Sequence, residues 1–465
     1  MSDRAQILGT RLMPSNQAES DIAAQIYKSV ANLPIISPHG HVDPNLLLKN
    51  EPFADPATLF VFHDHYVTRL LHADGVAMEA LRPGADPRFA WRELCSRWHL
   101  FLGTSSGYWL AAELLEMFGI DETPSASNAD ELFDRIAAKL TDPEFLPRAL
   151  FAKFNISMLA TTDDPCDDLE AHRLLAEEPN FGGRVVPTFR PDAYTNALAP
   201  AWPEHVARIL AKVGRKSNPT LEDFLEALAE RRAFFRANGA ISTDHGVVEP
   251  YTVELSRARA SDLFNLAMNG AAGPSELREL SGYLLFEMFR AAAEDGLVMT
   301  VHAGVYRNHS GQTFEAFGPD TGHDIPIRAE FTNNLRPAFE KFGLNSKLHV
   351  ILFALDETTW AREIAPLAGF YPSVFVGAPW WFLDAPDAAM RFRDAITDSV
   401  GFYRGSGFID DTRAFLSIPA RHDMARRIDS AYLAKLVVQQ RLTIEQAKQI
   451  AHDLVVAVPK RAFKL

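Results

Sequence analysis

Eight short segments of apolar and β-branched residues recur along the chain, and each ends in polar residues before a longer stretch of helical character. Because these segments do not alternate strictly between apolar and polar positions, they are typical of parallel strands covered on both faces. The helical stretches between them supply the crossovers that parallel strands require. The predicted strands are residues 34–37, 156–161, 185–189, 240–243, 297–301, 348–355, 374–377 and 407–410.

This succession of strand and helix predicts an α/β fold, a (β/α)8 TIM barrel. The polar residues that follow the strands would then gather at the carboxyl face of the barrel, where such barrels carry their active sites. The alternative is an open, doubly wound sheet. No glycine-rich phosphate-binding turn follows the first predicted strand, which argues against nucleotide binding.

A long stretch separates the first two predicted strands, and apolar residues recur in it at helical spacing over 89–102 and 108–118. We therefore expect a large helical insertion after strand 1, placed over the barrel mouth. The polar, glycine-containing segment 304–326 is either an active-site lid or a plain surface loop. The predicted regions are 1–50 with an N-terminal helix and the first strand, 51–150 with the insertion, and 151–465 with the remaining barrel and C-terminal helices.

The charge balance narrows the partners. The chain has 46 Lys and Arg against 60 Asp and Glu, a net charge of -14, which disfavours nucleic acid and anionic membrane surfaces. No stretch reaches transmembrane length, and the polar start over 1–14 lacks a signal-peptide core, so we expect a cytoplasmic protein. Cys95 and Cys166 are too few for a disulfide framework. A small-molecule substrate and a homo-oligomer are the expected partners.

Histidines mark the first strand. His39 and His41 lie two apart around Gly40, so on an extended backbone both imidazoles point to one face and can converge on a metal ion. Spacing alone is a weak signal, because chance produces such pairs. His63 and His65 are spaced alike in a region with helical character, where residues two apart diverge. His65 and its neighbour Tyr66 therefore either donate hydrogen bonds to a substrate or lie on a polar surface.

Polar and aromatic residues also follow later strands. Asp411 and Arg413 end the eighth predicted strand. The Asp411 carboxylate is a candidate metal ligand or proton acceptor, and the Arg413 guanidinium is a candidate binding group for a substrate carboxylate. The structural alternative is an ion pair between the two. The other candidates, each with a purely structural alternative, are Arg190 for a substrate carboxylate, His302 as a ligand or hydrogen-bond donor, and Trp380 and Trp381 as a pocket wall for a sugar.

Several of these stretches occur together in one known family. They are His39-Gly40-His41, Asp64-His65-Tyr66, Thr161-Thr162-Asp163-Asp164-Pro165, Arg190-Pro191-Asp192, Asp244-His245-Gly246, Arg307-Asn308, Gly318-Pro319-Asp320-Thr321-Gly322, Trp380-Trp381-Phe382, Asp411-Thr412-Arg413 and Phe415-Leu416-Ser417. Over nearly its whole length the chain resembles the uronate isomerases, also called glucuronate isomerases, of the amidohydrolase superfamily. It departs from their pattern at Gly40, where a Cys is frequent, and at Asn308-His309-Ser310.

The resemblance implies an aldose–ketose isomerase that converts D-glucuronate to D-fructuronate and D-galacturonate to D-tagaturonate. The implied metal ligands are His39, His41 and Asp411, and the implied substrate contacts are His65, Tyr66, Arg190, His302, Trp380 or Trp381, and Arg413. Two imidazoles and a carboxylate favour Zn²⁺.

For the mechanism we expect Asp411 to take the C2 proton and return it to C1, while Tyr66 or His65 polarises the carbonyl and Arg190 and Arg413 hold the carboxylate. A metal-assisted hydride shift is the mechanistic alternative. The functional alternatives are a metal-dependent hydrolase of the same superfamily and a sugar-acid binding protein without catalysis. A deaminase-type histidine is absent after the sixth strand, which ends in Leu355-Asp356-Glu357.

Overall fold

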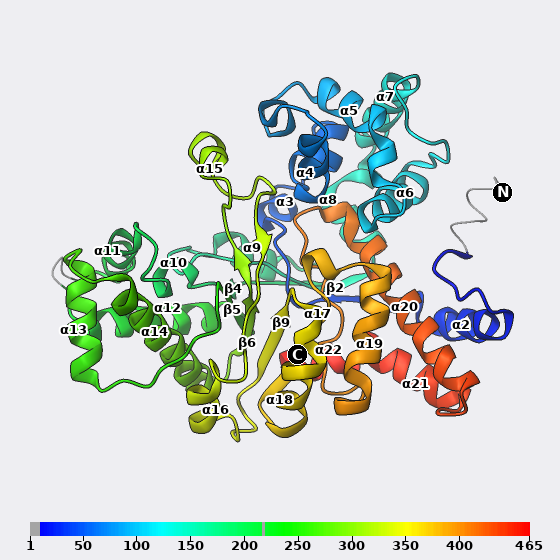
Figure 1. Ribbon diagram of the computed structural model, residues 1–465. Coiled ribbons are helices and arrows are strands. Elements are labelled where there is room, and N and C mark those ends of the chain that lie inside the picture. Colours follow the sequence, from blue (N-terminus) through cyan, green and yellow to red (C-terminus); the bar gives the residue numbers. More distant parts are fainter. Residues whose placement is uncertain (1–9, 216–218) are drawn as a thin grey trace.

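The computed structural model describes residues 10–215 and 219–465, so residues 1–9 of the predicted region 1–50 lie outside the described residues. A group of parallel strands occupies the centre, and helices surround it (Figure 1). The central strands are β1 (Ile35–Ser37), β2 (Ile156–Ala160), β3 (Arg184–Val186), β4 (Thr188–Phe189), β5 (Ser242–Val247), β6 (Val298–Ala303), β9 (Val350–Ala354) and β10 (Val374–Val376).

These strands form two hydrogen-bonded arrays, β1-β2-β3 and β10-β9-β6-β5-β4, that meet at Pro187. Pro187 has no N–H and divides one predicted strand into β3 and β4. Beyond β2, Asp163 continues the pairing, since its N–H donates to the Thr188 carbonyl and its carbonyl accepts from the Arg190 N–H, both at 3.0 Å. The strand order therefore runs without a break from β10 to β1.

The eighth predicted strand, residues 407–410, is wrong as a regular strand, because this part of the chain is irregular. Ser406 Oγ donates to the Gly407 carbonyl and accepts from the Ala378 N–H, and Gly407 has a φ of +74°. Local hydrogen bonds of the Ser406 side chain thus replace the backbone hydrogen bonds of a regular strand. The segment still joins the edges of the array, through the Ser406 N–H to the Val376 carbonyl at 2.9 Å and the His41 N–H to the Thr412 carbonyl at 3.0 Å.

Two strands extend further toward the site than their apolar residues indicate. The prediction ended the fourth strand at residue 243, but β5 continues to Val247, so Asp244 lies within it. Likewise β6 continues to Ala303 and includes His302. Both strands pair residue by residue over this extension, with Asp244 opposite Thr300. Polar side chains here lie on rigid backbone.

Helices cover the outside of the array and pack apolar side chains such as Trp202, Phe224, Phe264 and Phe289 against the strands. The helices between β2 and β10 are α9 (Glu170–Glu177), α10 (Asp192–Thr195), α11 (Trp202–Lys212), α12 (Leu221–Ala237), α13 (Arg257–Met268), α14 (Pro274–Asp295), α15 (Gly311–Phe317), α16 (Arg336–Phe342), α17 (Glu357–Thr359), the π-helix η5 (Trp360–Ile364) and α18 (Ala365–Phe370).

The predicted insertion is helical, and in the view of Figure 1 it lies above the central strands. Several of its helices begin at side-chain caps, as at Asp86 and Thr104, and one ends at Gly119 with a φ of +65°. The elements between β1 and β2 are α3 (Pro44–Lys49), η1 (Thr58–Phe62), α4 (His65–Ala73), η2 (Met78–Leu81), α5 (Pro87–Ser96), η3 (Trp98–Phe101), α6 (Ser105–Phe118), α7 (Ala129–Leu140), η4 (Pro143–Phe145) and α8 (Pro147–Lys153). Their buried cluster continues into β1 and β2.

The two ends of the described chain pack together, because α2 (Gln17–Val30) lies against the C-terminal helices (Figure 1). The C-terminal elements are η6 (Trp381–Leu383), α19 (Pro386–Val400), η7 (Phe415–Ser417), α20 (Ile418–Val438), α21 (Ile444–Val455) and α22 (Ala457–Phe463). Among the helices of 10–215 and 219–465, none combines the length and apolar character that crossing a membrane demands.

Candidate active site

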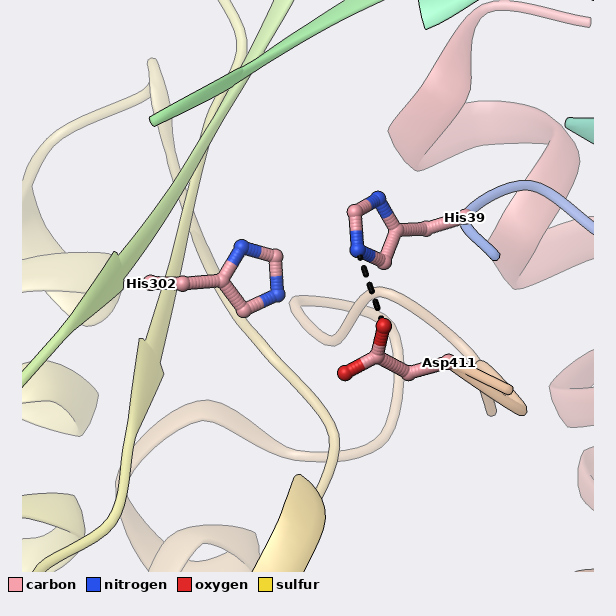
Figure 2. Close-up of side chains that lie close together, drawn as sticks. All are labelled: His39, His302 and Asp411. Atoms are coloured by element: carbon pink, nitrogen blue, oxygen red, sulfur yellow. Dashed lines mark ion pairs between the residues drawn. The ribbon is translucent and has the colours of Figure 1, made fainter. Parts of the chain in front are cut away.

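Two histidines and an aspartate from distant parts of the chain meet at the carboxyl end of the strands. His39 follows β1, His302 lies in β6, and Asp411 lies in the irregular eighth segment. Figure 2 shows their rings and carboxylate around a common space, and one nitrogen or oxygen of each lies within 4.8 Å of the others. Asp411 Oδ1 is 3.2 Å from His39 Nε2 and 2.8 Å from His41 Nε2.

The donor atoms of this cluster suit a metal cation. Asp411 Oδ1 is buried, and despite its short distances to both rings it forms no hydrogen bond of acceptable geometry within the described chain. His302 Nε2 is also buried without a partner, while Nδ1 of the same ring lies 2.7 Å from Asp244 Oδ1. Buried polar atoms are normally satisfied. Nitrogen and oxygen atoms left unpaired around one point are the ligand set expected for a divalent metal.

The electrostatics of the cluster favour metal-binding protonation states at two ligands. Burial would raise the pKa of Asp411, but His41 and His39 hold it well below its usual range. Burial lowers the pKa of His41 to about 4. At His39 the burial effect is outweighed by Asp244 and Asp411, so its pKa is raised. Because a ligating imidazole must be neutral, a cation at this position would compete with a proton for His39.

Asp244 stands behind the cluster and connects it to an arginine. Besides His302, it accepts a hydrogen bond from Thr300 Oγ1 at 2.9 Å, and its Oδ2 is 3.4 Å from Arg190 Nη1. Burial would raise the pKa of Asp244, but the charges of His302 and Arg190 hold it well below its usual range. A carboxylate that fixes the ring of a candidate ligand is a common support of metal sites. The sequence motif contained Asp244, but its position inside β5 was not predicted.

His65 and Tyr66 reach the same place from the start of α4. Asp64 caps this helix, since its Oδ1 accepts the Tyr66 N–H at 2.8 Å. The two rings stack with centroids 5.1 Å apart, and the Trp381 ring lies 5.5 Å from His65. Burial raises the pKa of Tyr66 and lowers that of His65. Tyr66 therefore keeps its O–H and the neutral imidazole of His65 keeps one N–H near pH 7, so both can donate to a carbonyl oxygen.

One cavity of about 270 Å³ contains all of these groups. Every residue that the sequence predicted for the site lines it: His39, His41, His65, Tyr66, Arg190, His302, Trp380, Trp381, Asp411 and Arg413. The residues that line it without a predicted role are His63, Asp64, Asp244, Arg307, Asn308, Pro319, Asp320, Asp324, Thr412 and Ala414. Most of these adjoin a motif already quoted, but Asp324 does not, and no local pattern marks it.

The segment 304–326 contributes several of these unpredicted residues. It is a short antiparallel pair, β7 (Val305–Tyr306) with β8 (Ile325–Pro326), and it carries the helix α15 (Gly311–Phe317), which projects away from the barrel (Figure 1). Its Asp320 Oδ2 accepts a hydrogen bond from Arg413 Nη2 at 3.0 Å. Its Gly322 packs against Arg69 of α4. The segment thus bridges the eighth segment and the insertion above the cavity.

Backbone strain concentrates around this cavity. Asn308, Asp320, Trp381 and Asp411 all have positive φ angles, of 54°, 62°, 52° and 43°, although none is glycine. Such conformations are unfavourable for L-residues and gather at functional sites. At Trp381 and Asp411 the strained backbone directs the side chain into the cavity wall.

Known proteins match the chain along almost its full length. The family model described as glucuronate isomerase matches residues 12–463. The chain belongs to the glucuronate isomerase family. A uronate isomerase of Cutibacterium acnes is 48% identical over 461 residues, which are 98% of each chain. A uronate isomerase of Corynebacterium efficiens is 46% identical over 460 residues, again 98% of each chain.

Solved structures of glucuronate isomerases agree with the fold. The glucuronate isomerase of Caulobacter crescentus has a TM-score of 0.95 at 43% identity, covering 98% of this chain and 96% of that one. The uronate isomerase of Thermotoga maritima has a TM-score of 0.91 at 28% identity, covering 95% and 97%. The predicted family and (β/α)8 fold class are confirmed, although the eighth segment is not a regular strand. The roles of single residues remain predictions.

Proposed function

We propose that this chain interconverts D-glucuronate with D-fructuronate and D-galacturonate with D-tagaturonate. The observation that carries the proposal is the meeting of two imidazoles, a carboxylate and arginines in one cavity of a glucuronate isomerase family member. An aldose–ketose exchange needs a base that moves a hydrogen between C2 and C1 and donors that stabilise the enediolate between them. The cavity residues supply both.

Asp411 is the proposed base. Its Oδ1 faces His39 and His41, which leaves Oδ2 to accept the C2 proton and return it to C1. The low pKa of Asp411 keeps it ionised and ready to accept. Tyr66 or His65 donates a hydrogen bond to the carbonyl oxygen O1 and stabilises the negative charge that develops there. The same side chain passes a proton to O1 and takes one from the O2 hydroxyl, so that C2 becomes the new carbonyl carbon.

His39, His41 and Asp411 are the proposed metal ligands, and His302 offers a further nitrogen. We propose Zn²⁺, since imidazole and carboxylate ligands suit it. When bound, the cation polarises substrate oxygens and lowers the energy of negative charge beside it. Arg190 and Arg413 hold the substrate carboxylate, and Trp380 and Trp381 form the wall against the sugar's C–H face.

Assembly and location extend this proposal. We expect a cytoplasmic homo-oligomer built from regions 1–50, 51–150 and 151–465, which transforms a small hexuronate in carbohydrate metabolism. Light scattering after size-exclusion chromatography tests the oligomer directly. A single species with the mass of one 51.7 kDa chain would contradict it.

The decisive experiment joins metal analysis to assays with both hexuronates. We expect ketose formation, its loss after chelation, and its recovery on adding Zn²⁺. Release of ammonia or alcohol from amides or esters, with no ketose from either hexuronate, would favour the hydrolase alternative instead. Solvent deuterium in the ketose after turnover in D2O would establish proton transfer, whereas ketose without deuterium fits a hydride shift or a proton that Asp411 returns without exchange.

A further inference from the structure

A buried arginine, Arg421, lies next to Tyr66 on the side away from the cavity. It belongs to the first turn of α20, which packs against α6 of the insertion (Figure 1). The Arg421 side chain is only 1% exposed and does not line the cavity, whereas Tyr66 does. A charge in such buried surroundings acts strongly on its neighbours, because little solvent screens it.

The polar contacts of Arg421 leave one side of its guanidinium group uncompensated. Nε donates to Ser417 Oγ at 3.0 Å, and Nη1 donates to Asp384 Oδ2 at 3.1 Å. Nη2 is buried and has no hydrogen-bond partner within residues 10–215 and 219–465. Because a buried cation is costly unless its donors are satisfied, the remaining compensation has to come from other groups around it.

Two aromatic rings lie beside the guanidinium. Arg421 Cζ is 3.6 Å from the centre of the Trp109 ring and 5.2 Å from that of the Tyr66 ring. The two rings contact each other edge to face, with centroids 5.6 Å apart. The face of an aromatic ring attracts a cation, most strongly where water is excluded. Arg421 therefore fixes the Tyr66 ring and would also stabilise negative charge on its phenol oxygen.

The charges around Tyr66 oppose one another. Burial has the largest effect on the pKa of Tyr66 and raises it. Among the charges, that of Arg421 acts most strongly and lowers this pKa, whereas those of Asp384, Asp411 and Asp64 raise it. The three carboxylates thus disfavour negative charge on the phenol oxygen, and Arg421 offsets part of their effect.

Arg421 also connects Tyr66 with the proposed base. Its Nη1 lies 3.5 Å from the carbonyl oxygen of Asp410, the residue that directly precedes Asp411. Ser417, which accepts the hydrogen bond from Nε, lies in the short helix η7 that follows Asp411. One side chain therefore links the backbone on both sides of Asp411 to the ring of Tyr66, which fixes the spacing of the two proton-transfer groups.

We propose that Arg421 is a positioning residue for the isomerisation, which holds the Tyr66 ring and stabilises the negative charge that its oxygen carries between two proton transfers. The inference rests on the proposed function. When Tyr66 gives its O–H proton to O1 it becomes a tyrosinate, and it becomes a phenol again by taking the proton of the O2 hydroxyl. The cation proposed at His39 and Asp411 acts on substrate oxygens, whereas Arg421 acts on Tyr66.

The test is a double-mutant cycle between Arg421 and Tyr66. Because removal of Arg421 alone would leave Asp384 as an unpaired buried charge, Arg421→Met is combined with Asp384→Asn. The kcat and KM for D-glucuronate are measured with the Zn²⁺-loaded wild type, this neutral-pair variant, Tyr66→Phe and the combination of all three substitutions.

We expect the neutral-pair variant to lower kcat by roughly tenfold, the loss of a desolvated cation–aromatic contact, and to change KM by less than about twofold. Tyr66→Phe should lower kcat by roughly 10²-fold or more. In the Tyr66→Phe background the neutral pair should have no further effect on kcat, because the oxygen that Arg421 supports is absent.

Arg421→Lys is the conservative variant and provides a second cycle if the neutral-pair variant does not fold. It keeps a charge beside Asp384 without the planar contact, so kcat should fall by about threefold, and this loss should also disappear in Tyr66→Phe. Arg426→Lys is the matched control on the same helix. Arg426 is buried and donates to the carbonyls of Ala31 and Leu33 at 2.7 and 2.9 Å, away from the cavity. Its substitution should lower stability and leave kcat unaltered.

The proposal would be overturned if substitutions of Arg421 reduced kcat by the same factor with and without the Tyr66 hydroxyl, or did not reduce it at all. Full activity of Tyr66→Phe would also overturn it and would leave His65 as the side chain that passes the proton in the proposed function. A wild type that isomerises neither hexuronate would instead contradict the proposed function itself.

Discussion

The proposed metal-binding cluster and the 304–326 segment line the same cavity but are built in opposite ways. His39 and His302 follow or lie in barrel strands and are 1% and 3% exposed. Asp320 of the segment and its partner Arg413 are 47% and 36% exposed. Charges in the cluster are buried and mutually compensated, whereas the ion pair of Asp320 with Arg413 lies in partial contact with water.

This difference suits the two regions to different functions. Ligands of a cation have to be held at fixed distances, which rigid strand ends achieve. A substrate has to enter and leave, which accessible loop residues permit. Changes in the cluster should therefore affect metal binding and the chemical step, and changes in the segment should affect substrate affinity.

Asp411→Asn should have the largest effect. It removes both the proposed base and a charged ligand, so we expect kcat to fall by roughly 10³-fold or more and metal content to decrease. Circular dichroism should remain that of the wild type. A metal-loaded variant with full activity would remove Asp411 from both roles.

Asp244→Asn should come next. It keeps the shape of the side chain but removes the charge that holds His302 and Arg190, and loss of such support costs roughly 10- to 100-fold in metal affinity or activity. Metal titration and kcat provide the measurement. Asp356→Asn is the matched control, because Asp356 also follows a barrel strand without lining the cavity. Equal effects of the two substitutions would show that Asp244 has no special role.

Asp163→Asn should change how stability depends on pH. Burial raises the pKa of Asp163 from 3.8 to about 7, so in this window the folded state holds a proton that the unfolded state has released. Wild-type stability should therefore fall relative to the variant as pH rises from 3.8 to about 7. Urea unfolding of both proteins across this range measures the difference. A constant difference would mean that Asp163 titrates normally in the folded protein.

Asp320→Asn should have the smallest effect on stability, below about 0.5 kcal/mol, because its ion pair with Arg413 is exposed. Asn also tolerates the positive φ at this position. Without the competing carboxylate, KM for hexuronate should fall by roughly two- to fivefold with kcat unchanged. The control is Asp398→Asn, which removes the exposed ion pair of Asp398 on α19 with Arg441. This pair does not line the cavity, so KM should be unaltered. A large loss of kcat in Asp320→Asn would place the segment in the chemistry.

Much of the barrel could be predicted because apolar runs report burial directly. The eighth segment was wrongly predicted as a strand because Ile409 is buried. Its neighbours form local side-chain hydrogen bonds, as Ser406 does with Gly407, in place of the backbone hydrogen bonds of a strand. Strand ends were also misplaced, because Asp244 and His302 are polar residues that β5 and β6 bury within the strand. Asp244 and His302 are buried because each is the other's hydrogen-bond partner. A pattern of apolar residues cannot predict such a strand position, since the partner lies far away in the sequence.

The site residues that could be predicted are histidines, acids, arginines and aromatic residues that lie near the ends of predicted strands. The ion pair of Arg307 with Asp324 was not predicted, because it depends on the register of the β7–β8 hairpin. No turn motif in the sequence indicates this register. His39 and His41 could be predicted as metal ligands because both lie at the end of one strand. Ligation by these residues remains a prediction, as do the region boundaries at 50 and 150 and the function of segment 304–326 as a lid.

The left-handed backbone at Trp381 has a consequence for engineering. A bulky residue in this conformation costs about 1 kcal/mol or more. The Trp381 side chain, however, is buried in an apolar cluster, and emptying such a site costs about 3–5 kcal/mol. Glycine at position 381 would therefore relieve the backbone and still lower the unfolding temperature, and it would remove the ring that lies over the Arg307 guanidinium.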